Sequence, residues 1–339
     1  MKVKRILLDH GSGGLATKEL IEELFLPILS NPWLNRMEDS AVLEPTKGRV
    51  AFTTDSYVVD PLFFPGGDIG SLSIHGTIND LAMQGAEPAA LSLGLILEEG
   101  LPIDDLRKIA SSLGKASKEA GIPIVAADTK VVPKGKADKI FINTSGIGYI
   151  QQDIELGSQL ARPGDAVIVS GTLGDHGIAV MGTRAGLGLD LSIKSDTAPL
   201  HKLVKLLLKN FASAIKCLRD PTRGGLATVL SEIAAASKVE IVVDEAAIPI
   251  QPQVQSVCDL LGLDPLYLAN EGKLVAIVDS SMADNIVQAM RNEELGRKAS
   301  VIGRVNKSEM GKGRTILCTA IGGKRLLEPL SGEPLPRIC

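Results

Sequence analysis

The sequence predicts a two-domain protein of the α+β or α/β class, with mixed sheets flanked by helices. The chain has 339 residues, enough for about two domains with a sizeable core. Strand-like and helix-like segments are mixed along its whole length, with no short internal repeat. A polar segment, 151–163, separates two such series. We therefore expect a glycine-rich segment and helix over 1–40, domains over 41–152 and 153–325, and a mobile tail over 326–339.

Composition excludes several classes of function. Aromatic residues are 3% of the chain and the net charge is -4, so nucleic-acid binding through stacking or a basic surface is not expected. Four cysteines lie far apart without a CxxC pair, which indicates a reducing cytoplasm and excludes a standard structural zinc site. No apolar run is long enough to span a membrane, and the N-terminus does not read as a signal peptide. We expect a cytoplasmic protein with neither nucleic-acid nor membrane partners.

Hydrophobic periodicity assigns the elements of the first half. The segment 17–29 is strongly amphipathic, with Thr17 as a possible N-cap. A second amphipathic helix ends at Gly121, a typical helix stop. The elements expected here are helices over 17–29, 69–85 and 103–120 and strands over 49–54, 89–97, 123–127 and 139–147.

The second half repeats this mixture after the polar segment. The expected strands lie at 166–170, 240–243 and 273–279 and near positions 301 and 315. The expected helices cover 200–216, the stretch that follows the DPTRGG motif as far as position 237, and 282–292.

A glycine-rich turn, HGSGG at 10–14, precedes the first helix. Such a turn at a helix N-terminus is a plausible phosphate cradle, and a flexible leader is an equally good reading. It is not a P-loop, because no Gly-Lys pair in the chain is followed by Ser or Thr, and no GxGxxG occurs.

Five aspartates share a context, since each lies beside a small or polar residue at an expected loop or element end. They are Asp39, Asp55, Asp80, Asp128 and Asp220. Taken singly, each is more often a turn residue or helix cap. Together with glycine-rich loops, they suit Mg²⁺, which binds through a few carboxylates and nucleotide phosphates. His75 lies one helical turn before Asn79 on the same face and is a candidate ligand or acid–base group, although a structural histidine is commoner.

The chain ends in LSGEPLPRIC, with a terminal cysteine, Cys339. Two prolines, a glycine and no apolar periodicity predict an extended, mobile arm that is not part of a core. An ordinary ragged terminus is the alternative.

Several motifs together resemble a known superfamily. They are HGSGG at 10–14, DSA at 39–41, TDS at 54–56, NDLAM at 79–83, DTKVV at 128–132, DPTRGGL at 220–226 and NEG at 270–272. In this order they are similar to the aminoimidazole ribonucleotide synthetase-like (PurM-like) ATP-binding superfamily. With the PRIC ending, the whole chain resembles its HypE family, the carbamoyl dehydratases of [NiFe]-hydrogenase maturation.

This resemblance implies a fold of two AIR synthase-like domains, the first binding ATP and Mg²⁺ and mediating dimerisation. It also implies an activity on the chain's own tail. A carbamoyltransferase, HypF, carbamoylates the terminal cysteine, and ATP is used to dehydrate the group to a thiocyanate. The cyano group then passes to iron held by a HypC–HypD complex. The superfamily is typically a homodimer with nucleotide near the subunit interface.

The resemblance also directs the site assignments. Cys339 carries the group, and Glu271, in a tight Asn-Glu-Gly turn, is the expected base, with a turn-cap role as its alternative and His75 in reserve. The expected Mg²⁺ ligands are Asp39, Asp55, Asp80 and Asp220, with Asp128 as a further candidate. The expected nucleotide-binding residues are Gly11, Gly13, Gly14, Asn79, Asp128, Thr129, Lys130 and Asn270. For Lys130, a structural ion pair is the alternative to phosphate binding.

Two other functions fit parts of the sequence. A small-molecule ATP enzyme of the same superfamily, of the selenophosphate synthetase or thiamine-monophosphate kinase type, would work without the tail. A non-catalytic carrier of the carbamoyl group would turn over no ATP, and it leaves the carboxylates and glycine-rich loops without a purpose.

Overall fold

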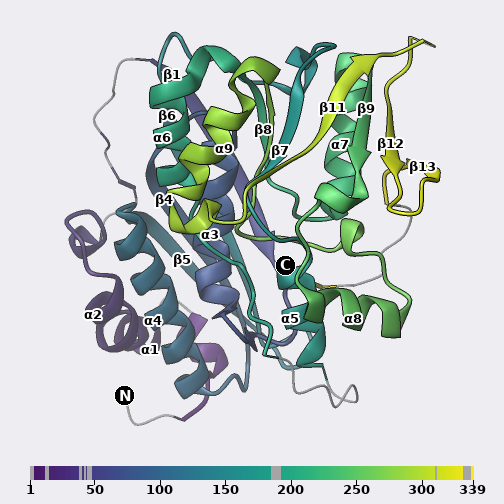
Figure 1. Ribbon diagram of the computed structural model, residues 1–339. Helices are drawn as coiled ribbons and strands as arrows, with labels where there is room; N and C mark the ends of the chain where they lie inside the picture. The colour runs from purple at the N-terminus through teal and green to yellow at the C-terminus, as the bar shows by residue number, and fades with distance from the viewer. Residues whose placement is uncertain are drawn as a thin grey trace.

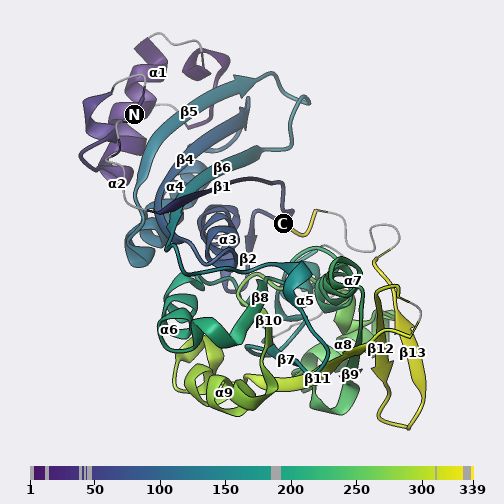
Figure 2. The same cartoon turned by 90° about the horizontal axis from the view of Figure 1, so that it is seen from above.

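A computed structural model describes residues 4–11, 15–37, 40–41, 43, 48–184, 192–309, 311–330 and 337–339. Its described part is built on two mixed sheets, one in each half of the chain, with helices packed on them (Figures 1 and 2). This confirms the predicted fold class. The first sheet ends with Ile150 and the second begins with Ala166, so the polar segment 151–163 does lie between the two.

The first sheet has four strands. In spatial order they are β1 (Arg49–Tyr57), β6 (Ile140–Ile150), β4 (Glu87–Glu98) and β5 (Ile124–Val132). β6 pairs antiparallel with both neighbours, and β4 and β5 run parallel. A small hairpin follows β1 and consists of β2 (Phe63–Phe64) and β3 (Gly67–Asp68).

Two long helices cover one face of this sheet, α3 (Ile69–Met83) and α4 (Ile103–Ala120). The predicted bounds of α4 are correct, because its buried apolar residues recur at helical spacing and Gly121 ends it with a φ of +78°. α3 begins with a capping box in which Asp68 and Ser71 bond each other's main-chain amides. α3 is buried on nearly every side and so brings its polar residues between the two domains (Figure 2).

The predicted helix over 17–29 is present as one continuous helical stretch with a central π turn. Its parts are α1 (Leu15–Leu20), the π turn Ile21–Phe25 and α2 (Leu26–Leu29). It packs beside α4 and the edge strand β5 (Figure 1).

The second sheet has seven strands. In spatial order they are β13 (Lys324–Leu327), β12 (Arg314–Cys318), β9 (Val239–Asp244), β11 (Ser300–Lys307), β7 (Ala166–Val169), β10 (Val275–Val278) and β8 (Ile215–Arg219). β7 and β10 are buried on both faces, which explains their uninterrupted runs of apolar residues. α7 (Gly225–Ser237) covers one face, and α6 (His201–Phe211) and α9 (Ala283–Arg291) cover the other (Figure 2).

Two further helices, α5 (Asp175–Gly182) and α8 (Pro252–Leu261), pack on each other at one end of the second domain. The sequence analysis assigned neither of them, and it also missed β8, which it read as the end of the helix over 200–216. Asp220 directly follows this strand.

Candidate functional site

A cavity of about 290 Å³ lies between the two domains. β1 and α3 contribute Thr53 and Asp80, and the end of β8 with the loop before α7 contributes Arg219, Asp220 and Arg223. The cavity therefore combines carboxylates from both halves of the chain with guanidinium groups from the second half.

Asp80 and Asp220 carry carboxyls that disfavour each other's charge. Burial raises the pKa of Asp80, a hydrogen bond from Thr53 Oγ1 to its Oδ2 (2.9 Å) opposes this, and Asp55 adds to the rise. Burial and the charges of Asp80 and Asp55 raise the pKa of Asp220 to about 7. Like charges held together in this way are stabilised by a cation between them.

Asp55 belongs to this group through the geometry of β1. Thr53, Asp55 and Tyr57 occupy alternate positions of the strand and share one face. Thr53 bonds Asp80 of α3, and the Tyr57 hydroxyl meets Thr77 of the same helix at 3.4 Å. Asp55 and Asp80 therefore lie inside a strand and a helix, not at the element ends that the sequence analysis expected, and Asp128 lies within β5.

Glu271 lies in the loop before β10 and is 3% exposed. Its Oε1 has no hydrogen-bond partner within the described part of the chain. Burial, followed by the charges of Asp220 and Asp196, raises the pKa of Glu271 well above its usual value. An unpartnered buried carboxyl next to other carboxylates destabilises the fold, and groups with such perturbed pKa values cluster at functional sites.

Asn79 and Asn270 are both almost fully buried, and their side-chain amides form hydrogen bonds with main-chain groups. Asn79 donates to the carbonyls of Ala198 and Glu271 and accepts from the amide of Leu200. Asn270 donates to the carbonyl of Pro221 in the DPTRGG loop and to that of Leu268, and it accepts from the Gly174 amide. Both amides hold together the loops around Glu271, and their predicted role in nucleotide binding stays a prediction.

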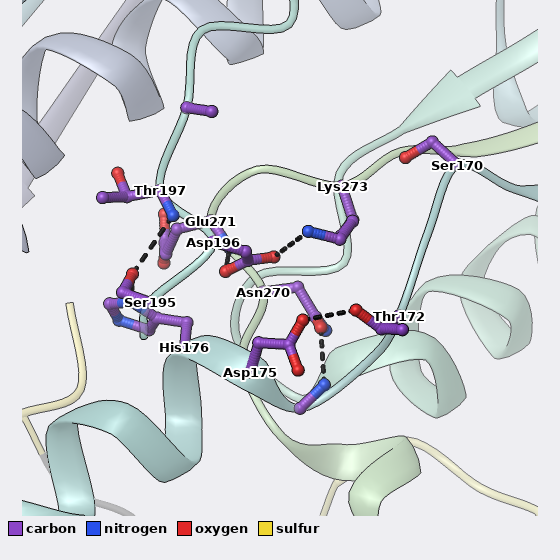
Figure 3. Close-up of polar contacts among 12 residues, drawn as sticks. Ser170, Thr172, Asp175, His176, Ser195, Asp196, Thr197, Asn270, Glu271 and Lys273 are labelled. Carbon is purple, nitrogen blue, oxygen red and sulfur yellow. Dashed lines mark hydrogen bonds and ion pairs between the residues drawn. The ribbon is translucent and has the colours of Figure 1, made fainter. Parts of the chain in front are cut away.

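The segment Ser195–Thr197 crosses directly over Glu271 (Figure 3). The Asp196 carboxylate accepts a hydrogen bond from the Glu271 amide (3.0 Å) and forms a salt bridge with Lys273 (3.1 Å). This salt bridge is buried, with side chains that are 3% exposed for Asp196 and 13% exposed for Lys273. A Cβ at Gly272 would lie 1.8 Å from the Asp196 carbonyl oxygen, so only glycine fits there. The sequence analysis missed this segment and Lys273.

Two histidines are joined to the same segment. His75 Nδ1 lies 3.1 Å from Thr197 Oγ1, and His176 Nδ1 lies 2.8 Å from Ser195 Oγ. His176 is fully buried at the start of α5, and Phe64 stands edge-on to its ring at 5.4 Å.

The last three residues are docked between the domains, near the end of β1 (Figure 2). Val58 and Asp60 donate their amides to the carbonyls of Cys339 and Arg337, each at 3.1 Å. Ile338 is 7% exposed and belongs to the core of the first domain. The sequence analysis expected the whole tail to stay outside a core, whereas residues 337–339 are packed; residues 331–336 lie outside the described part.

A second cavity, of about 300 Å³, lies between the N-terminal helices and β5 and shares no lining residue with the first. It collects four of the predicted nucleotide-binding residues: Gly11, Asp128, Thr129 and Lys130. Asp128 and Lys130 form an exposed ion pair at 2.8 Å. A Cβ at Gly11 would lie 2.6 Å from the Val131 amide nitrogen. Asp39, Gly13 and Gly14 lie outside the described residues.

The predicted metal ligands are only partly brought together. Within the described ranges, no three carboxylate, imidazole or thiolate groups converge closely enough to form a metal site on their own. Asp80, Asp220 and Asp55 interact electrostatically, an arrangement that suits Mg²⁺ only if phosphate oxygens complete its shell.

Replacing His75 with glutamine is expected to flatten the pH dependence of stability. Burial, and then the nearby His201, lower the pKa of His75 to about 4, against about 6.5 in the unfolded chain. Between these values the unfolded state binds more protons, so the free energy of unfolding falls as pH drops from 6.5 to 4, by up to about 3 kcal/mol.

Urea unfolding of the wild type and His75→Gln from pH 4 to 7.5 measures this contribution. The buried carboxylates are common to both proteins, so their contribution cancels in the difference between the two free energies of unfolding. If this free energy varied with pH in the same way in both proteins, His75 would not be buried in its neutral form.

Comparison with known proteins identifies the family to which this fold belongs. Residues 37–150 match the AIR synthase related protein N-terminal domain, and residues 162–315 match the AIR synthase related protein C-terminal domain. The two domain matches together identify an AIR synthase related protein.

Individual relatives are more specific. Carbamoyl dehydratase HypE of Cupriavidus necator is 52% identical over 340 residues, covering 100% of this chain and 96% of that protein. A crystal structure of hydrogenase maturation protein HypE in complex with ATP has a TM-score of 0.94 at 49% identity, covering 98% of this chain and 99% of that one. HypE in a HypE–HypF complex has a TM-score of 0.80 at 47% identity, covering 92% and 99%.

The chain belongs to the HypE carbamoyl dehydratase family, which confirms the resemblance seen in its motifs. Within the described ranges, no helix combines the length and apolar character needed to cross a bilayer.

Proposed function

We propose that the chain uses ATP to dehydrate a carbamoyl group on the sulfur of its own Cys339, forming a thiocyanate that supplies cyanide ligands for the iron of [NiFe]-hydrogenase. The observation that carries this proposal is the docked tail. Cys339 is bonded to Val58, the residue that directly follows β1 and lies three residues beyond Asp55, an extended-chain distance of about 10 Å. ATP-dependent loss of water from the carbamoylated chain tests the proposal directly.

The reaction proceeds in two steps. The carbamoyl oxygen attacks the γ-phosphorus of ATP and ADP leaves, so that the oxygen becomes part of an imidate phosphate. One nitrogen proton is lost as the imidate forms. The second is lost as phosphate departs with the oxygen, and the carbon–nitrogen triple bond of the thiocyanate forms. Protein catalysis of the first step consists mainly of positioning and of stabilising phosphate charge.

Mg²⁺ bound with ATP would neutralise the phosphate charge, and the carboxylates of Asp80, Asp220 and Asp55 suit it. Their mutual repulsion favours a cation, and Asp39, outside the described residues, remains a proposed fourth ligand. Arg219 and Arg223 line the same cavity and supply further positive charge. The known complex of a 49% identical HypE with ATP supports nucleotide binding. Gly11 and the Asp128–Lys130 stretch, which share the second cavity, remain proposed nucleotide contacts.

Glu271 is proposed as the base that accepts the nitrogen proton. A carboxylate with a raised pKa is a stronger base than an ordinary one. Its main chain is bonded on both sides, to Asp196 and to Asn79, so its side chain is presented from a rigid loop. Burial also excludes water, which would otherwise hydrolyse the activated intermediate.

The partners follow from the same proposal. HypF delivers the carbamoyl group, which the known HypE–HypF complex supports, and a HypC–HypD complex accepts the cyano group. Two copies are proposed to pair through the outer face of the first sheet, where Val50 and Phe52 are 59% and 71% exposed. Phe52 also lines the first cavity. The four cysteines form no disulfide, which fits the cytoplasm.

Replacing Asp80 with asparagine is expected to lower Mg²⁺-dependent ATP cleavage on the carbamoylated chain by roughly ten- to a hundred-fold. The side chain keeps its size and its hydrogen bond with Thr53 but loses the charge that holds the cation. Steady-state ADP release at several Mg²⁺ concentrations measures the effect, and excess Mg²⁺ should restore part of the rate.

Asp105→Asn is the matched control, because Asp105 forms an exposed ion pair with Lys108 on the surface of α4. A normal rate for Asp80→Asn would remove Asp80 from the proposed site.

A further inference from the structure

The tail is held at two positions besides its pairing with Val58 and Asp60. Arg337 forms an ion pair with Asp138 and donates from Nε to the Val58 carbonyl (2.8 Å), and Arg184 donates to the Arg337 carbonyl (3.1 Å). His176 contacts Ile338, the residue between Arg337 and Cys339, and its Nε2 lies 2.8 Å from the Ile338 carbonyl oxygen. Residues 337–339 are therefore bonded both by the first domain and by His176 of α5.

The hydrogen-bond partners determine the protonation of His176. The Thr197 amide can only donate, so Ser195 Oγ accepts from it (3.1 Å), and when the ring is neutral with its proton on Nε2, Ser195 Oγ donates its own hydrogen to His176 Nδ1. The Ile338 carbonyl can only accept, so Nε2 carries the ring proton. Both requirements are met by one neutral tautomer. Burial also lowers the pKa of His176, which is consistent with a neutral ring.

Both nitrogens of the His176 ring are hydrogen-bonded, and packing fixes the orientation of the ring. Phe64 of the β2–β3 hairpin stands perpendicular to it, at an interplanar angle of 89°. Without the Nε2–H donor, the carbonyl of Ile338, a residue that is 7% exposed, would lose its partner in a buried position. Arg337 has a φ of +55°, a conformation that non-glycine residues adopt only when their surroundings enforce it.

We propose that His176, oriented by Ser195, is a positioning residue that docks the terminal Arg337–Cys339 segment and thereby fixes where Cys339 is presented. The segment Ser195–Thr197 would then orient both the docked tail and the proposed base. Ser195 bonds His176, and the adjacent Asp196 bonds the main chain of Glu271. The docking is independent of the chemistry, whereas its catalytic consequence depends on the proposed function.

Amide hydrogen exchange of the full-length protein tests the docking. The amides of Val58 and Asp60 donate to the tail, so their protection reports how often it leaves. In His176→Leu these two amides are expected to exchange about tenfold faster, equivalent to ~1.4 kcal/mol, while β1 amides paired with β6 keep wild-type rates. His176→Gln, which keeps an N–H donor, should restore part of the protection.

His201→Gln is the matched control, because His201 bonds the Ala120 carbonyl at another site between helices and should leave both amides unchanged. If His176→Leu fails to fold, Ser195→Ala decides, with a smaller acceleration at the same two amides. Unchanged protection in a folded His176→Leu, or in Ser195→Ala when that variant decides, would overturn the proposal.

A second measurement relates docking to catalysis. After HypF-dependent carbamoylation, His176→Leu should form thiocyanate about tenfold more slowly, with carbamoylation itself unaffected. Faster amide exchange together with normal thiocyanate formation would refute the positioning role while leaving the dehydratase proposal intact. Absence of thiocyanate in the wild type as well would instead count against the proposed function.

Discussion

A chain with Cys339 replaced by serine is expected to form no thiocyanate at all while still binding ATP. A cysteine thiolate accepts a carbamoyl group readily, whereas a serine hydroxyl is a far weaker nucleophile. The docked main chain of residue 339 is held through its carbonyl and the Val58 amide, so the substitution should leave the tail in place. Product formation by mass spectrometry and ATP binding by calorimetry measure the two properties separately.

Cys318→Ser provides the control for thiol loss in general, because Cys318 is the last residue of β12, which lies next to the edge strand β13 of the second sheet. It should retain full activity. Thiocyanate formation by Cys339→Ser at the wild-type rate would exclude the tail as the site of chemistry and favour a small-molecule enzyme of the superfamily.

Glu271→Gln is expected to separate the two steps of the reaction. The amide has the shape of the carboxyl, and the main-chain bonds of residue 271 to Asp196 and Asn79 do not involve the side chain. ADP should therefore still form on the carbamoylated chain, in about a single turnover. Thiocyanate formation should slow by at least about a hundred-fold, the usual contribution of a positioned base.

Rapid quench, with ADP and thiocyanate followed together, resolves the two steps, and the exposed Glu293→Gln serves as a control. Wild-type thiocyanate formation in Glu271→Gln would mean that the base lies elsewhere. His75 is then the next group to test, although with a pKa of about 4 its ring is a weak base.

The fold was largely predictable because local patterns follow burial. α4 packs one face on the core, and its spacing of apolar residues gave its bounds. β8 and α5 were missed because each is short and nearly all of α5 is buried, so periodicity does not distinguish them from their surroundings. α8 was missed although Val254, Val257 and Cys258 recur at helical spacing between Pro252 and the helix stop Gly262. Asp55 and Asp80 were assigned to element ends, whereas their surroundings come from packing between the domains.

The site was predictable only in part. The motifs contain Asp80, Asp220 and Glu271, which the structure brings into one group of interacting carboxyls, but no local pattern indicates that Asn79 and Asn270 bond the main chain of other loops. Asp196 lies 75 residues from Glu271 in sequence and has no motif of its own. Lys273 directly follows the Asn-Glu-Gly motif and is the one missed residue that this motif could have indicated. The terminal segment contacts His176 and the residues after β1, which only the tertiary structure brings together.

The most direct test of the central claim is intact mass spectrometry of the full-length protein, first carbamoylated by HypF and then given Mg²⁺ and ATP. The account predicts a carbamoyl adduct on Cys339 that loses the mass of one water only when ATP is present. An adduct that persists unchanged with ATP would contradict the dehydratase proposal and leave the chain as a carrier.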